Sequence, residues 1–162
     1  LFRNFIFIGI QMNKLKWLKK FLKDYITTLH PESRVNMQRL AEAYIFFEEK
    51  NFDESLEALS RIDFEIFHFK IDIRILQLKI FFELNFHEEA YSLIDTFRHF
   101  ISNNKFISER YKINCQNFIN FCYRLFRQKE NRDYAELISL KKEIYKNSFN
   151  KDWLLKKVDE MI

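Results

Sequence analysis

Glycine and proline are nearly missing from this sequence, since its 162 residues include one of each. A strand-rich fold uses these residues repeatedly in its turns, so their scarcity favours helices joined by short polar connections. The single glycine, Gly9, also excludes the glycine-rich loops that bind phosphate groups in many nucleotide-binding proteins.

Cysteine is scarce as well, with only Cys115 and Cys122. Two helical turns separate them by roughly 10 Å, which is too far for a disulfide. We interpret both as reduced core residues, because they lie on an apolar stripe and a reactive thiolate needs a partly exposed, electropositive site. Reduced cysteines are typical of intracellular proteins, so we expect a cytoplasmic location.

Metal-binding and catalytic patterns are missing too. The sequence has no Cys-x-x-Cys, and none of its four histidines is paired at i, i+4: His30, His68, His87 and His99. His87, beside two acids at a helix start, is expected to be solvated. The adjacent acids 48–49 and 88–89 point to different sides of a helix and cannot form an acid–base couple. We therefore expect no metal, no cofactor and no enzymatic activity.

Long hydrophobic runs do not occur near the start of the chain. The apolar stretch Phe5–Ile10 is too short to cross a membrane, and no signal-peptide cleavage pattern follows it. We interpret residues 1–12 as a separate segment, either a truncated helix or a frayed end. Residues 13–162 are enough for one domain with a real core, and 48% of the chain is hydrophobic.

Helical periodicity accounts for most of what is present. The predicted helices cover residues 13–29, 34–50, 52–62, 69–84, 86–102, 108–128, 134–146 and 153–162. Pro31 suits the first turn of a helix and Ser108 suits an N-cap. The alternation in KIDIRIL, at 70–76, also fits a strand, but the surrounding run is about four helical turns long and favours a helix.

Two stretches are nearly the same: FFEEKNFDESLEAL at 46–59 and FFELNFHEEAYSL at 81–93. The Phe-Phe-Glu triplets are 35 residues apart, and the Asn-Phe pairs at 51–52 and 85–86 are 34 apart. A period near 34 is typical of a helix–turn–helix repeat, whose helix pairs bury their apolar faces on their neighbours. Asn51 and Asn85 are expected to make the turns, because asparagine tolerates the left-handed conformation.

On these residues the chain resembles tetratricopeptide-like repeat proteins. The stretches 75–108, 117–127 and 151–161 resemble a group of uncharacterised bacterial helical-repeat proteins, and the resemblance covers most of the chain from about Trp17 onward. A looser third copy has Tyr134 as its turn aromatic. The resemblance implies an all-α, right-handed solenoid of stacked antiparallel helix pairs with a C-terminal capping helix, and no activity. The consensus repeat has small residues where its helices contact each other. One copy has Ser55 and Ala58 at these positions, whereas in the next copy the corresponding pair, Glu89 and Ala90, is shifted.

A partner of such a solenoid is expected to dock in the concave groove lined by the first helix of each pair. Cationic residues on those helices could attract an acidic segment: Arg34, Arg39, Arg74, Lys79, Arg110 and Arg124. In each adjacent phenylalanine pair, 46–47 and 81–82, one ring is expected in the core and one at a seam between helices.

The stretch KLKWLKKFLKDY, at 14–25, forms a basic amphipathic helix. One side carries lysines: Lys16, Lys19, Lys20 and Lys23. The other side is apolar: Leu15, Leu18, Phe21 and Leu22, continued by Tyr25, Ile26 and Leu29. Such a helix is either the first of the stack, with its lysines in water, or a binder of anionic membranes or nucleic acid.

Three functions remain in consideration. The favoured one is a non-catalytic scaffold that binds a protein or peptide. The alternatives are a nucleic-acid- or membrane-surface-associated adaptor acting through Lys14 to Lys23, and a structural homo-oligomer in which an uncapped end stacks on its copy. The net charge of +4 is only a weak indication of an anionic partner.

Overall fold

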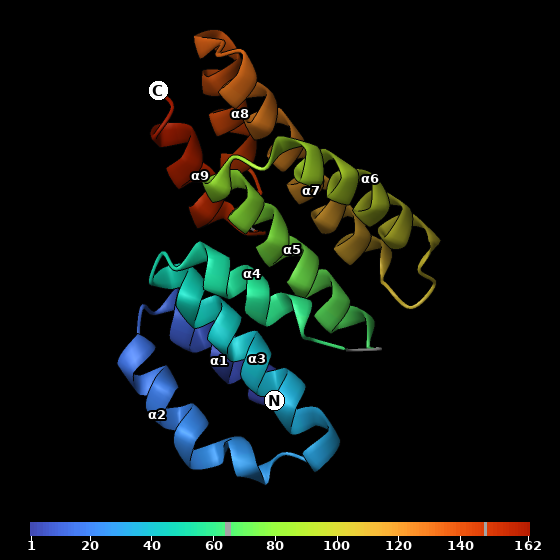
Figure 1. The fold of residues 1–162 in the computed structure, drawn as a ribbon. Coiled ribbons are helices and arrows are strands. Elements are labelled where there is room, and N and C mark those ends of the chain that lie inside the picture. The colour runs from blue at the N-terminus through green and yellow to red at the C-terminus, as the bar shows by residue number, and fades with distance from the viewer. Residues whose placement is uncertain (64–65, 148) are drawn as a thin grey trace. The chain divides into compact units, whose positions relative to one another are not determined.

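The computed structural model describes residues 1–63, 66–147 and 149–162, and all regular structure in these ranges is helical (Figure 1). The helices are α1 (Phe2–Gln11), α2 (Leu15–Tyr25), the 3₁₀ turn η1 (Ile26–Thr28), α3 (Pro31–Glu48), α4 (Phe52–Ser60), α5 (Phe67–Leu84), α6 (His87–Asn103), α7 (Glu109–Glu130), α8 (Tyr134–Tyr145) and α9 (Lys151–Asp159). The all-α prediction is confirmed, and the KIDIRIL stretch is helical.

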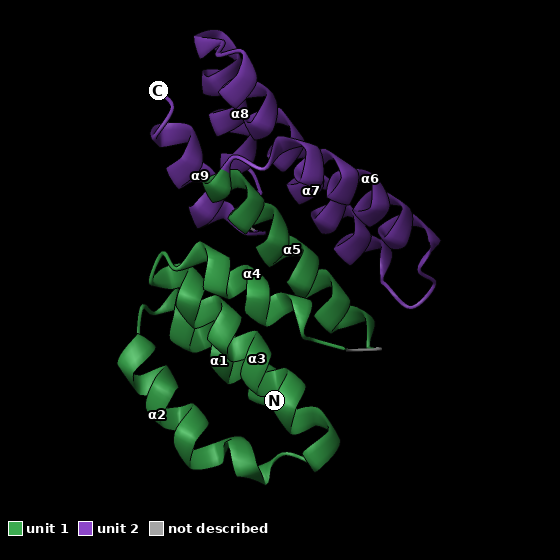
Figure 2. Ribbon diagram, viewed as in Figure 1, with its two compact units in different colours: residues 1–84 green, residues 85–162 purple. Residues whose placement is uncertain are grey.

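The chain divides into two compact units, residues 1–84 and 85–162 (Figure 2). In unit 1, α3 packs against α1, η1, α4 and α5, so α3 is the central helix. In unit 2, α7 packs against α6, α8 and α9 and has the corresponding role. Both predicted core cysteines, Cys115 and Cys122, are buried on α7.

Residues 2–11 form a helix, α1, which packs against α2 and α3. Its buried face carries Ile6 and Gly9. A Cβ added at Gly9 would lie 3.2 Å from the Leu18 Cβ and 3.2 Å from the Trp17 ring, so this glycine permits the close approach of α1 to α2. The first segment is therefore a packed part of unit 1.

The turn after α3 shows where sequence reasoning misplaced one residue. Lys50, with φ 63°, takes the left-handed conformation, while Asn51 has φ −88°, so the prediction for Asn51 is wrong. The Asn51 N–H donates to the Phe46 carbonyl at 2.8 Å and the Lys50 N–H to the Phe47 carbonyl at 3.0 Å, which is a Schellman motif. The prediction for Asn85 is confirmed, with φ 59°.

Backbone and burial recur with a spacing of 35 residues. The residues that precede α4 and α6 are Asn51 (φ −88°, ψ 73°) and Phe86 (φ −84°, ψ 78°), which are 35 positions apart. Four positions later, Ser55 and Ala90 are both fully buried. Further buried pairs at this spacing are Ala41 and Leu76, Ala43 and Leu78, Ile45 and Ile80, Phe47 and Phe82, and Leu59 and Ile94.

This spacing corrects the sequence alignment of the two copies. The Phe-Phe-Glu triplets give the register that the backbone follows, and the 34-residue alignment on asparagine is off by one. The small residue of the second copy is thus Ala90, which is buried, and not Glu89, which is exposed. In each phenylalanine pair the second ring is buried and the first is partly exposed, as expected.

The Ser108 side chain accepts from the Tyr111 N–H at 3.4 Å, which confirms the predicted N-cap of α7.

The connection of α7 to α8 departs from the expected third copy. At the start of α8, Asp133 accepts from the backbone N–H groups of residues 135 and 136. Tyr134, the expected turn aromatic of the third copy, is 60% exposed and so is not packed like Phe52, which is partly buried against Phe47.

Candidate functional site

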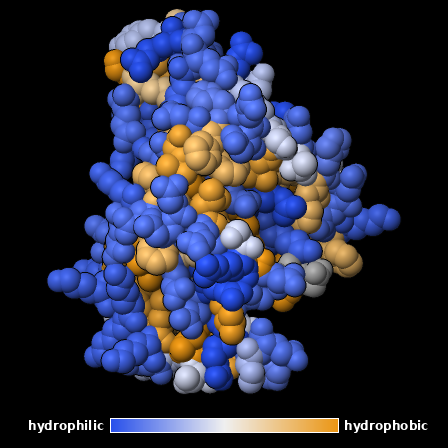
Figure 3. Space-filling view, viewed as in Figure 1, coloured by the Kyte–Doolittle hydropathy of each residue, from blue (hydrophilic) through white to orange (hydrophobic). Residues whose placement is uncertain are grey.

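Unit 1 exposes large apolar side chains along α1 and α2. One stripe runs along α1 and its two capping residues, is spaced by four, three and four residues, and consists of Leu1, Phe5, Ile8 and Met12. Hydrophobic side chains are visible among hydrophilic ones where Figure 1 draws the blue helices (Figure 3). Clustered exposed apolar residues of this kind are typical of interaction sites.

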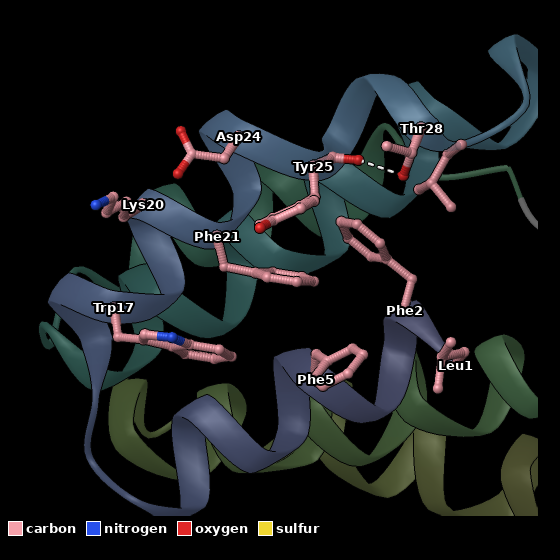
Figure 4. A pocket seen from close by; sticks show the side chains of 10 residues that line it. Leu1, Phe2, Phe5, Trp17, Lys20, Phe21, Asp24, Tyr25 and Thr28 are labelled. Atoms are coloured by element: carbon pink, nitrogen blue, oxygen red, sulfur yellow. Dashed lines mark hydrogen bonds between the residues drawn. The ribbon is translucent and has the colours of Figure 1, made fainter.

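Beside this stripe, a groove of about 710 Å³ lies between α1 and α2 (Figure 4). Phe2 and Phe5 come from α1, and Trp17, Phe21 and Tyr25 come from α2. The remaining lining residues are Leu1, Lys20, Asp24, Thr28 and Leu29. We call this site the aromatic groove.

Phe21 is the centre of the aromatic groove. Its ring stacks on Trp17 at 5.3 Å between centroids, with an angle of 18° between the planes. It also contacts Phe2 at 4.9 Å, Phe5 at 5.2 Å and Tyr25 at 5.2 Å. Cation-binding aromatic cages need rings spread around a central space. These rings touch one another instead, so the groove suits apolar side chains.

The helical spacing of α2 explains how the groove forms. Trp17, Phe21 and Tyr25 follow one another at i, i+4 and i+8 and so share one side of the helix. Leu18 and Leu22 occupy the neighbouring stripe and are buried. Trp17 is 44% exposed and Tyr25 is 53% exposed. The prediction that Tyr25 continues the core stripe is therefore wrong.

The lysines of α2 lie on its solvent side. Lys16, Lys20 and Lys23 are exposed, and Lys20 lines the aromatic groove. Lys19 donates to Glu49 at 2.5 Å. Residues 14–25 carry five lysines and one aspartate, a net charge of +4 that equals the net charge of the whole chain. The rest of unit 1 has a net charge of −3, and unit 2 has a net charge of +3.

Two of the six cations predicted to line a concave groove hold neighbouring segments of unit 1. Arg34 donates to the carbonyls of Thr27 and Leu29 at 2.9 and 3.1 Å. Arg39 donates to the carbonyl of Arg61, just after α4. These contacts stabilise the ends of η1 and α4, so both guanidinium groups have a structural role.

Arg124 on α7 is similarly engaged in unit 2. Its guanidinium donates to Glu136 at 2.8 Å and to both carboxylate oxygens of Glu143 at 2.8 and 2.9 Å. Hydrogen bonds from Arg124 lower the pKa of Glu143. On α5, Arg74 donates to the Lys70 carbonyl at 3.2 Å, and burial lowers its pKa. The last two candidates are Lys79, which is partly exposed, and Arg110, which is exposed.

A polar cluster of Tyr91, His87 and Glu130 joins α6 to α7. Glu130 accepts a hydrogen bond from the Tyr91 hydroxyl at 2.9 Å, and its carboxylate lies 3.1 Å from His87 Nδ1. Burial and this bond raise the pKa of Tyr91 to about 12, and bonds from Tyr91 and His87 lower the pKa of Glu130. His87 is therefore a partner of Glu130, contrary to the expectation that it is solvated. An adjacent hollow of about 240 Å³ is too small for most ligands.

In the part of the chain that the structure describes, no group of three or more His, Cys, Asp or Glu side chains could hold a metal ion. None of the helices described is long and apolar enough to cross a membrane. No protein-family model, no curated protein and no solved structure matches this chain.

Sequence reasoning missed the aromatic groove for one reason. Trp17, Phe21 and Tyr25 share a helical stripe that is visible in the sequence, but Phe2 and Phe5 lie in residues 1–12, which the sequence predicts to be separate from the domain. The signal was present in the 4-3-4 spacing of the α1 stripe, which is typical of a helix with a second apolar face.

Proposed function

We propose that this protein is a non-catalytic binding module that holds an apolar segment of another protein in the aromatic groove. The single observation that carries the proposal is that five aromatic rings line one open groove and that three of them, Phe5, Trp17 and Tyr25, are exposed. Its volume of about 710 Å³ lies within the range of roughly 300–1,000 Å³ that is typical of binding pockets. Apolar grooves between helices commonly receive the apolar face of a partner helix.

The polar residues of the aromatic groove support binding rather than catalysis. The Thr28 hydroxyl donates to the Tyr25 carbonyl at 2.6 Å, so it is already used (Figure 4). The ionisable side chains among the lining residues are Lys20 and Asp24 on the rim, together with Tyr25. This set lacks a nucleophile paired with a base, which acyl or phosphoryl transfer would require.

The same proposal includes a tetratricopeptide-like architecture. The 35-residue recurrence of the residues before α4 and α6, and of the buried positions around them, supports two copies of one helix–turn–helix repeat. Repeat proteins of this class commonly act as scaffolds without catalytic groups. In this chain, however, the aromatic groove lies on α1 and α2, upstream of the two copies, and not on the first helices of the pairs.

A designed peptide tests the proposal. The probe is a labelled 16-residue helical peptide with leucine at i, i+3, i+4 and i+7 and neutral glutamine elsewhere, and its affinity is measured by fluorescence anisotropy. We expect saturable binding that weakens about tenfold or more in Trp17→Ala or Tyr25→Ala, as is typical when a central aromatic is truncated. Both rings are substantially exposed, so folding should be preserved.

Tyr134→Ala provides the matched control, because Tyr134 is 60% exposed and lies in unit 2. It should leave the affinity unchanged. The proposal would be abandoned if the peptide does not bind at millimolar concentration, or if it binds with the same affinity to the groove variants and the control.

A further inference from the structure

We infer that the segment held in the aromatic groove is an amphipathic helix with a row of acidic residues along one flank. This inference rests on the proposed function and specifies the partner that the groove accepts. The observation behind it is that residues 14–25 carry a local net charge of +4, and that one of their lysines, Lys20, lines the groove.

The positions of the lysines determine which of them face a bound segment. Lys20 lines the aromatic groove itself. Lys16 and Lys23 lie four residues before and three residues after it, so they share its exposed side of α2. Lys19 donates a hydrogen bond to Glu49 at 2.5 Å, so we do not include it among the lysines that face a bound segment. We call Lys16, Lys20 and Lys23 the lysine row.

Asp24 makes the charge on the rim of the aromatic groove differ between its two ends. It lies four residues after Lys20 on the rim, beside Tyr25. The rim is therefore positive near Trp17 and carries a carboxylate near Tyr25. A partner whose acids lie against Lys16 and Lys20 is attracted, whereas an acid placed against Asp24 is repelled. Specificity of this kind combines attraction with repulsion.

The dimensions of the aromatic groove favour a helical partner. From Trp17 to Tyr25 the groove follows eight residues of α2, a rise of about 12 Å at 1.5 Å per residue. A partner helix covers that length in about two turns, and its apolar anchors at i, i+3, i+4 and i+7 lie on one face. Its acidic flank then runs parallel to the lysine row.

A flat anionic membrane fits the same surface less well. The rings of Trp17 and Tyr25 both pack on Phe21 within the groove, so they line a hollow. A bilayer surface is contacted by side chains that project from a helix face, and it cannot enter a hollow between two helices. The lysine row would attract either partner, and therefore the test includes vesicles.

Three peptides with one common apolar face separate these cases. Their flanking positions carry glutamate, glutamine or lysine. We expect the glutamate peptide to bind about tenfold more tightly than the glutamine peptide at 50 mM salt, because three exposed ion pairs contribute modestly. The advantage should largely disappear at 500 mM salt, where exposed charges are screened. The glutamine and lysine peptides should follow in that order.

Charge reversal of the lysine row provides the decisive variant. Lys16→Glu, Lys20→Glu and Lys23→Glu together should reverse the order, so that the lysine peptide binds most tightly. The matched control makes the same change in charge at three exposed lysines of unit 2 and consists of Lys105→Glu, Lys142→Glu and Lys146→Glu. It should leave the glutamate peptide as the tightest binder and the lysine peptide as the weakest. Circular dichroism checks that both triple variants remain helical.

The outcomes separate a failure of the proposed function from a failure of the acidic-flank inference alone. If no peptide binds, the proposed function fails and the inference fails with it. If all three peptides bind equally, the groove binds apolar segments and only the acidic-flank inference is overturned. If vesicles containing phosphatidylserine bind through the lysine row while no peptide does, the partner is an anionic membrane and both proposals are overturned.

Discussion

Arg3 on α1 and Asp72 on α5 form an ion pair with two hydrogen bonds, although 69 residues separate them. The Nε–Oδ2 distance is 2.5 Å and the Nη2–Oδ1 distance is 2.6 Å. Arg3 also lies over the Phe7 ring, with 4.6 Å from its guanidinium carbon to the ring centroid. Asp72 is buried, and its carbonyl accepts from the Tyr44 hydroxyl at 3.3 Å. The first helix is thus joined to the last helix of unit 1.

Breaking this pair should destabilise unit 1. Arg3→Met leaves a buried carboxylate without its cation, and the free energy of unfolding should fall by about 3 kcal/mol. The double variant Arg3→Met/Asp72→Leu should recover most of the loss, because it removes the stranded charge. Urea denaturation measures both. A single variant as stable as the parent would show that the pair contributes little.

The loss in Arg3→Met should depend on pH. Burial raises the pKa of Asp72 above 3.8, and the bonds from Arg3 act in the opposite direction. Without Arg3 the folded-state pKa rises further. A raised folded pKa gives stability that is present below the unfolded pKa and is lost as pH rises through the folded pKa. The variant should therefore lose more stability at pH 7 than at pH 4, which urea titrations at both pH values would show.

Tyr91 should ionise at unusually high pH. Burial and the bond to Glu130 raise its pKa to about 12. The absorbance difference between the protein and Tyr91→Phe at alkaline pH isolates this one tyrosine. Glu130→Gln removes the nearby charge and should lower the pKa, but burial keeps it above 10.0, the ordinary value. An unchanged midpoint in Glu130→Gln would show that burial alone sets the pKa.

Gly9→Ala should weaken peptide binding more than it changes stability. The new methyl group would lie 3.2 Å from the Leu18 Cβ, which is fixed in the core, and 3.2 Å from the Trp17 ring. α1 and α2 must therefore separate slightly, and the gain in helix propensity of about 1 kcal/mol offsets part of the cost. Anisotropy with the glutamate peptide and thermal denaturation test this. Asn4→Ala, an exposed position of α1, is the control.

Lys50→Gly should stabilise the protein by about 1 kcal/mol. The left-handed conformation of Lys50, with φ 63°, is unfavourable for a residue with a Cβ, and glycine adopts it without that cost. Glu49→Gly, at φ −80°, should instead destabilise, because the position is right-handed and the ion pair with Lys19 is lost. Equal effects of the two substitutions in chemical denaturation would contradict this account of the turn.

Sequence periodicity was sufficient for the helices from α2 onward but not for α1 or for the aromatic groove. The helix over 67–84 and the N-cap at Ser108 follow from local patterns, since spacing and capping act within a few residues. The left-handed Lys50 did not follow, because the turn is placed by the burial of Phe47 and Ser55 on either side, which is a tertiary constraint. The groove needed the contact of two helices, and no local pattern in α2 indicates that Phe2 and Phe5 lie opposite.

The concentration of positive charge on residues 14–25 has a practical consequence for measurement. A negatively charged solid support meets a net charge of +4 in this short segment, whereas the net charge of +3 in unit 2 is spread over 78 residues. A carboxylated sensor chip or a cation-exchange resin would hold the chain by the edge of the aromatic groove and cover that site. Tethering through unit 2 avoids attachment through the lysines of this segment.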